Sequence, residues 1–109
     1  MKDDLFRLAE SRAKALLESY KTQDYVSIAS RFTSPKPQDL SSEVISEKPH
    51  ITVTSWGQRE PDSRLAIIVE TRRKSRWIAA YKVSAYGFFI EQSGTITPME
   101  EKDLWSHGY

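Results

Sequence analysis

Apolar residues recur at helical spacing through the first third of the chain. Over residues 5–20 they fall three or four positions apart, with mainly charged residues between them, which is typical of a helix buried on one face. Asp3 and Asp4 precede this run, where carboxylates favour the start of a helix. A shorter run over residues 25–32 repeats the spacing behind Asp24, a residue suited to an N-cap. The pattern predicts two consecutive helices that form an αα-hairpin.

A connector and a series of strands are predicted beyond these helices. Pro35 and Pro37 exclude a helix from residues 33–43, where Ser and Asp favour turns. Alternation of β-branched or aromatic residues with polar ones then predicts strands over residues 50–56, 64–72, 76–83, 88–91 and 95–97. The run 64–72 is almost continuously apolar, which indicates a central strand covered on both faces. A helix over residues 75–87 is an alternative, because its apolar residues also fit helical spacing.

The C-terminal third carries signals for a strand irregularity and a last helical turn. Residues 85–87 contain Gly87 and predict a break or bulge, because glycine inside a strand often marks one. Thr97 is expected to cap a helical turn over residues 97–105. The apolar side chains of Leu104 and Trp105 would dock this turn against the rest of the domain. The order of elements predicts a single α+β domain over residues 1–109, in which an N-terminal αα-hairpin packs on a curved antiparallel sheet of four or more strands.

The helical segment "LAESRAKALLESYKTQDYVSIASRFTSP", residues 8–35, resembles the opening of NTF2-like (cystatin-like α+β) domains. It has an amphipathic helix, a short joint ending in Asp24, and a second helix ending in an aromatic residue. The resemblance implies a pocket between helix and sheet. Members of the family include enzymes, ligand-binding proteins and dimeric adaptors, so the resemblance does not select a function.

Composition narrows the classes of function. The chain of 109 residues has no Cys, so disulfides, thiolate chemistry and cysteine zinc sites are excluded. It has only four widely spaced Gly, which cannot form a glycine-rich phosphate loop. No stretch approaches the ~20 apolar residues of a membrane span, and the N-terminus is unlike a signal peptide. We expect a cytoplasmic protein with no membrane partner, no metal and no cofactor.

Candidate acid or base residues are few. His50 and His107 show no metal-ligand spacing, and surface positions are the simpler interpretation. Glu70 and Glu91 each stand in an apolar strand run, where burial could raise the pKa of a carboxyl into a catalytic range. The alternative for Glu70 is a solvent-facing position or a pair across the sheet with Arg72, Arg76 or Lys82.

A basic cluster is the most distinctive local feature. Net charge is +1, but residues 64–82 contain six basic residues and one acid, a local balance of +5 that leaves −4 for the rest. Four of the six fall within five positions, beside two aromatic residues, and this set is our predicted binding surface: Arg72, Arg73, Lys74, Arg76, Trp77 and Tyr81. We expect the basic cluster to form the tip of a β-hairpin. Trp77, Tyr81 and Val83 fall on one face of the returning strand, so their side chains would face the core. A nucleic-acid site would need a longer basic stripe with exposed aromatics, so this partner is disfavoured.

The function predicted from these features is a small, non-catalytic binding module. It would take a protein partner or small ligand at the concave face of the sheet and the basic hairpin, and a homodimer formed through the sheet would fit as well. A pocket enzyme that uses Glu70, Glu91 or His50 as acid or base is the second alternative. Nucleic-acid binding through Arg72 to Arg76 is the third.

Overall fold

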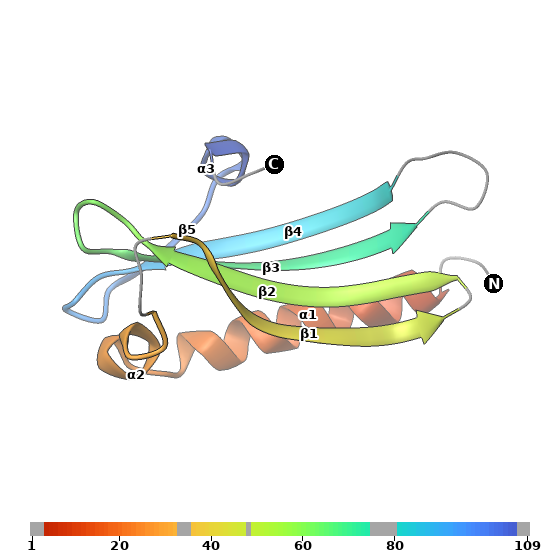
Figure 1. Cartoon of the computed structure of the whole chain (residues 1–109), viewed down its shortest axis with the longest axis horizontal. Helices are drawn as coiled ribbons and strands as arrows, with labels where there is room; N and C mark the ends of the chain where they lie inside the picture. The colour runs from red at the N-terminus through yellow and green to blue at the C-terminus, as the bar shows by residue number, and fades with distance from the viewer. Residues whose placement is uncertain (1–3, 33–35, 48, 75–80, 107–109) are drawn as a thin grey trace.

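Two helices precede five antiparallel strands, and a short helix follows them (Figure 1). The computed structural model describes residues 4–32, 36–47, 49–74 and 81–106, with only the backbone of Tyr81, Lys82 and Trp105. The predicted α+β class is confirmed. The elements are α1 (Asp4–Lys21), α2 (Tyr25–Ala29), β1 (Gln38–Glu47), β2 (His50–Arg59), β3 (Leu65–Lys74), β4 (Tyr81–Ile90), β5 (Ile96–Pro98) and α3 (Glu101–Ser106).

The helix predicted over residues 5–20 is confirmed as α1, which lies along one face of the sheet (Figure 1). Its buried stripe is Phe6, Ala9, Ala13, Leu17 and Tyr20. Alternate residues of β2, β3 and β4 meet this stripe, and burying each large apolar side chain contributes roughly 1.5–3 kcal/mol. The sheet residues of this core are Ile51, Val53, Leu65, Ile67, Val69, Phe88 and Ile90.

The second predicted helix is confirmed as the five-residue α2. Asp24 is its N-cap, and the carboxylate accepts a hydrogen bond from the backbone N–H of Ser27 at 2.7 Å. Tyr25 and Ile28 are buried. The Tyr25 hydroxyl donates to the backbone carbonyl of Ser63 at 2.6 Å, so α2 holds the turn between β2 and β3.

The sheet has the order β1-β2-β3-β4-β5, and β3 is its central strand. All residues of β3 from Leu65 to Thr71 are buried, which confirms the prediction of a strand covered on both faces. Leu65, Ile67 and Val69 point toward α1. The intervening Ala66, Ile68 and Glu70 belong to the opposite face, which we call the outer face.

The predicted connector over residues 33–43 is wrong from Gln38 onward, because β1 already begins there. Two register shifts in its pairing with β2 fall at Leu40 and Ile45. Both of these residues pack against the core. The shifts let a Ser-rich edge strand place two apolar side chains inward while it keeps its ladder with β2.

Strand β4 corrects two further predictions. It pairs with β3 residue by residue from Tyr81 to Ile90, so there is no bulge at residues 85–87, and a helix over 81–87 is wrong. Gly87 instead allows a close approach: a Cβ there would lie 2.5 Å from Met99 Sδ and 2.9 Å from the Ile67 carbonyl oxygen. The backbone N–H of Met99 donates to the Gly87 carbonyl. The C-terminal segment therefore crosses the outer face at this glycine.

The last strand and the C-terminal helical turn both form, but their predicted starts are wrong. The strand expected over residues 95–97 is β5, Ile96–Pro98. Thr97 lies in β5 and pairs with Phe89, so it is not an N-cap, and α3 begins only at Glu101. Leu104 is half-buried, as its predicted docking role requires. The expectations for residues 75–80, which include Arg76 and Trp77, lie outside the described residues.

Hydrogen bonds between buried hydroxyls join α1 to two strands. The Tyr20 hydroxyl lies 2.8 Å from Ser55 Oγ, which lies 2.6 Å from Ser41 Oγ on β1. Tyr20 and Ser55 are 3% and 1% exposed. Because an unpaired buried hydroxyl costs free energy, this chain of contacts fixes the position of α1 along β2.

We predict that Gly57→Ala destabilises the fold by about 1–3 kcal/mol, the range for an overpacked core. A Cβ at this position would lie 2.5 Å from the Ala66 carbonyl oxygen and 2.7 Å from the ring of Phe32. Urea unfolding of this variant and of Ser42→Ala, an exposed control on β1, measures the difference. Equal unfolding midpoints would contradict the tight approach of Phe32 to β2.

Candidate functional site

Glu70 is a buried carboxylate on the outer face of the central strand. It is 5% exposed, and its Oε1 lies 2.6 Å from Nε of Arg72, two residues further along β3. Burial raises the pKa of Glu70 above its ordinary value, although the charge and hydrogen bond of Arg72 lower it. The predicted partner Arg72 is thus confirmed, but the pair lies within β3 and not across the sheet, and the solvent-facing alternative is wrong.

The cross-strand register places Arg72 in a row of side chains on the outer face. Val44 pairs with Thr52, Thr52 with Arg72, and Arg72 with Val83. The two valines are 50% and 39% exposed, and the Arg72 side chain is 46% exposed. We call Val44, Thr52, Arg72 and Val83 the outer row. It combines exposed apolar surface with an arginine, a composition that protein interfaces favour.

The predicted basic cluster is divided between the two faces of the sheet. Arg72 and the exposed Lys74 occupy alternate positions of β3 on the outer face, while Arg73 pairs with Ile51 and lies on the α1 side. Val83 lies exposed on the outer face, so the prediction that it faces the core is wrong. The backbone of Tyr81 pairs with Lys74, and Arg76 and Trp77 are outside the described residues.

The candidate acid or base residues in the described ranges do not form one site, and Glu91 is exposed just beyond β4, so its predicted burial in a strand is wrong. Along β3, Glu70 is five residues from Leu65, which pairs with Ile90 next to Glu91. This is about 16 Å at ~3.3 Å per residue. His50 is exposed at the start of β2, 3.9 Å from Glu47. His107 lies outside the described residues.

Buried side chains of the helices and strands pack together between α1 and the sheet, where the family resemblance implies a pocket. Among the described residues, a cavity of about 580 Å³ lies at one end of the sheet, where the β2–β3 and β4–β5 turns meet. We call it the end cleft. Its walls are Asp62, Ser63, Arg64, Glu91, Gln92 and Ser93.

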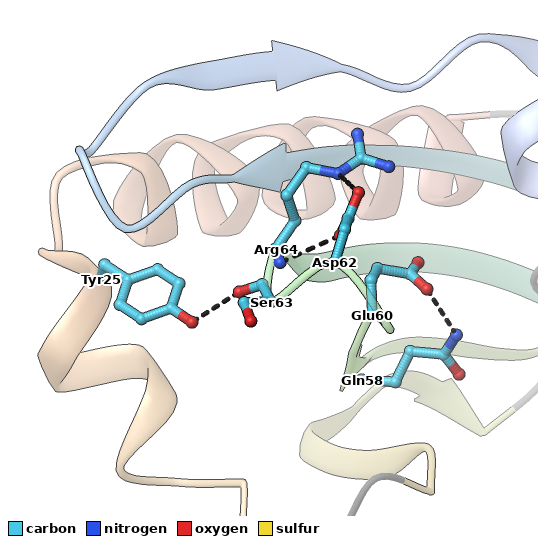
Figure 2. A network of polar contacts seen from close by, with 6 residues as sticks. All are labelled: Tyr25, Gln58, Glu60, Asp62, Ser63 and Arg64. Atoms are coloured by element: carbon cyan, nitrogen blue, oxygen red, sulfur yellow. Dashed lines mark hydrogen bonds and ion pairs between the residues drawn. The ribbon is translucent and has the colours of Figure 1, made fainter.

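One wall of the end cleft is the β2–β3 turn, in which Arg64 contacts Asp62 (Figure 2). The Arg64 Nε donates to Asp62 Oδ2 at 2.7 Å, and its guanidinium lies 4.3 Å from the centre of the Phe89 ring. A hydrogen bond from the backbone N–H of Arg64 lowers the pKa of Asp62, and the side chain of Arg64 adds to this effect. Asp62 thus stays charged and holds the guanidinium.

A metal site and a membrane-spanning helix were also searched for within the described residues. They contain no group of three His, Asp or Glu residues that could hold a metal ion. No helix within them is both long and apolar enough to cross a membrane. Comparisons with protein-family models, curated proteins and solved structures found no match for this chain.

Among the residues of the end cleft, sequence reasoning named Glu91 as a candidate and missed the other five. Turn-forming residues in the sequence favour turns at 57–63 and 92–94. Residues 57–59 belong to β2 instead, whereas Gly94 has the positive φ of a turn, 92°. In an antiparallel meander, alternate turns lie at the same end of the sheet. That rule would have brought Asp62 and Glu91 together, although the stacking of Arg64 on Phe89 has no sequence signature.

We predict that the pKa of the Glu70 carboxyl lies above its ordinary value of about 4.5 and rises further in Arg72→Met, because that variant lacks the charge that lowers it. Carbon-detected NMR titration of the side chain measures both values. A lower pKa in Arg72→Met would contradict the pair.

The same shift has a consequence for stability. Burial raises the pKa of Glu70 in the folded state. The contribution of this carboxyl to the free energy of unfolding is therefore fully present below the unfolded-state pKa and is lost as pH rises through the folded-state pKa. Between pH 4 and pH 7, Glu70→Gln should therefore gain stability relative to wild type. Glu47→Gln, at an 83% exposed side chain, should not. If the difference in free energy of unfolding between Glu70→Gln and wild type, measured with urea, stayed constant from pH 4 to pH 7, this prediction would be refuted.

Proposed function

We propose that the protein is a non-catalytic binding module that docks an acidic protein partner on the outer row and the adjoining basic hairpin. The observation that carries the proposal is the exposure of Val44 and Val83 on either side of Arg72 in one cross-strand row. Single exposed apolar residues are ordinary, but two aligned with an arginine make a continuous contact surface.

Placement on the outer face follows from the packing of α1. The other face is filled by the helix and the core, so a partner has no access to it. Toward the β5 end of the outer face, Ile68 and Phe89 are already buried. The accessible part of the outer face is therefore its β3–β4 hairpin end, where the outer row lies.

Charge favours an acidic partner. Arg72 and the exposed Lys74 lie together on the outer face at the hairpin end of β3. Positive surface around an apolar contact steers an acidic partner toward it and disfavours basic ones. A second copy of this chain fits less well, because both copies would present the same basic hairpin.

The proposal includes an NTF2-like architecture with an αα-hairpin, a curved sheet and a cytoplasmic location. The amphipathic α1, the short capped α2 and the antiparallel sheet support it. Pocket catalysis is disfavoured by the separation of Glu70, Glu91 and His50. Nucleic-acid binding is disfavoured because the basic residues of β3 alternate between two faces.

The test is a fluorescence-anisotropy titration with a short labelled peptide of Glu, Leu and Phe. We expect the wild type to bind it, and to bind the matched peptide with Gln in place of Glu at least about tenfold more weakly, a difference of about 1.4 kcal/mol. Val44→Glu and Val83→Glu should each weaken binding about tenfold or more. Val26→Glu, with the same charge change on α2 at a 75% exposed site, is the matched control.

Thermal unfolding followed by circular dichroism confirms that each variant is folded before titration. Loss of binding in Val26→Glu equal to that in Val83→Glu would contradict the proposal. The same holds if the acidic peptide does not bind at all. A labelled oligothymidylate that binds more tightly than the peptide, with a steep salt dependence, would favour the nucleic-acid alternative.

A further inference from the structure

We propose that the end cleft binds a small zwitterion, with the carboxylate of the ligand on Arg64 and its ammonium group on Glu91. This site is separate from the outer row. Arg64 and Arg72 are eight residues apart along the same strand segment, about 26 Å at ~3.3 Å per residue. The volume of the cleft, about 580 Å³, is within the range of small-molecule sites.

Arg64 is held in place with part of its hydrogen-bonding capacity left over. Its Nε and backbone N–H both donate to Asp62, and the ring of Phe89 supports the plane of the guanidinium. Its two terminal nitrogens extend past Asp62 in Figure 2, and neither donates to an acceptor in the part of the chain that the structure describes. Two parallel N–H groups on a fixed guanidinium match the two oxygens of a carboxylate.

Glu91 supplies the opposite charge on the other wall. It is exposed, lies in the β4–β5 turn and forms no ion pair with any residue in the described ranges. A ligand with only an anionic group would be repelled by Glu91 and Asp62, and one with only a cationic group would leave the terminal N–H groups of Arg64 without a carboxylate to bind. A molecule that carries both a carboxylate and an ammonium group satisfies both walls.

The wall that carries Arg64 is fixed before any ligand arrives. Ser63, next to Arg64, has a positive φ of 74°, an uncommon conformation for a residue with a side chain. The Tyr25 hydroxyl donates a hydrogen bond, drawn in Figure 2, to the Ser63 carbonyl oxygen at 2.6 Å. The backbone N–H of Glu60 donates to the Arg64 carbonyl at 2.7 Å. Contacts of this kind keep a strained turn in one shape and reduce the ordering cost of binding.

Calorimetric titration with ω-amino acids of increasing length tests the site. Glycine, 4-aminobutyrate and 6-aminohexanoate span a range of charge separations, and butyrate and butylamine each carry one of the two charges. We expect one zwitterion to bind best and both single-charge compounds to bind at least about tenfold more weakly. Arg64→Gln and Glu91→Gln should each weaken the best zwitterion by tenfold or more.

Glu47→Gln, at the opposite end of the sheet, is the matched control and should bind as wild type does. Arg64→Lys keeps the charge but lacks the paired N–H groups, so it should bind more weakly than wild type. Equal binding of butyrate and 4-aminobutyrate, wild-type affinity in Glu91→Gln, or no binding of any zwitterion would overturn the proposal. Binding of the acidic peptide by Arg64→Gln shows that the two sites are independent.

Discussion

The packing of α1 against one face of the antiparallel sheet is the contact on which the rest of this structure depends. One helix can cover only one face, and here its buried stripe meets β2, β3 and β4. The buried hydroxyls of Tyr20 and Ser55 fix where along the strands the helix lies. The opposite face must then be covered by something else or remain in contact with solvent.

Because α1 covers only the other face, the two ends of the outer face differ in how far they are covered. At the β5 end the C-terminal segment crosses at Gly87, where the absence of a Cβ lets Met99 approach the strand. At the β3–β4 hairpin end, Val44 and Val83 remain exposed, with Arg72 between them. The buried Glu70, two residues before Arg72 on the same face of β3, holds the guanidinium by an ion pair at 2.6 Å. A charged residue is thus positioned within an apolar surface, which would give the proposed partner both contact area and an electrostatic preference.

The sequence predicted those parts of the fold that depend on local pattern. The spacing in α1, the cap at Asp24 and the apolar run of β3 each follow from residues close together in the chain. The start of β1 could not be predicted, because its Ser-rich segment becomes a strand only by pairing with β2. The role of Gly87 was misread for a similar reason, since Met99 approaches it from a distant segment. The end cleft also depends on contacts between distant turns, so the pairing of Arg64 with Phe89 had no signal in the sequence.

The most direct test of the central claim, that the outer row is the docking surface, is a methyl NMR spectrum of valine-labelled protein during addition of the acidic peptide. The chain has five valines: Val26, Val44, Val53, Val69 and Val83. Val53 and Val69 are buried in the core, and Val26 is exposed on α2. Our account predicts that the signals of Val44 and Val83 shift while that of Val26 stays in place. A shift of Val26 alone, or unchanged signals of Val44 and Val83 at saturation, would contradict it.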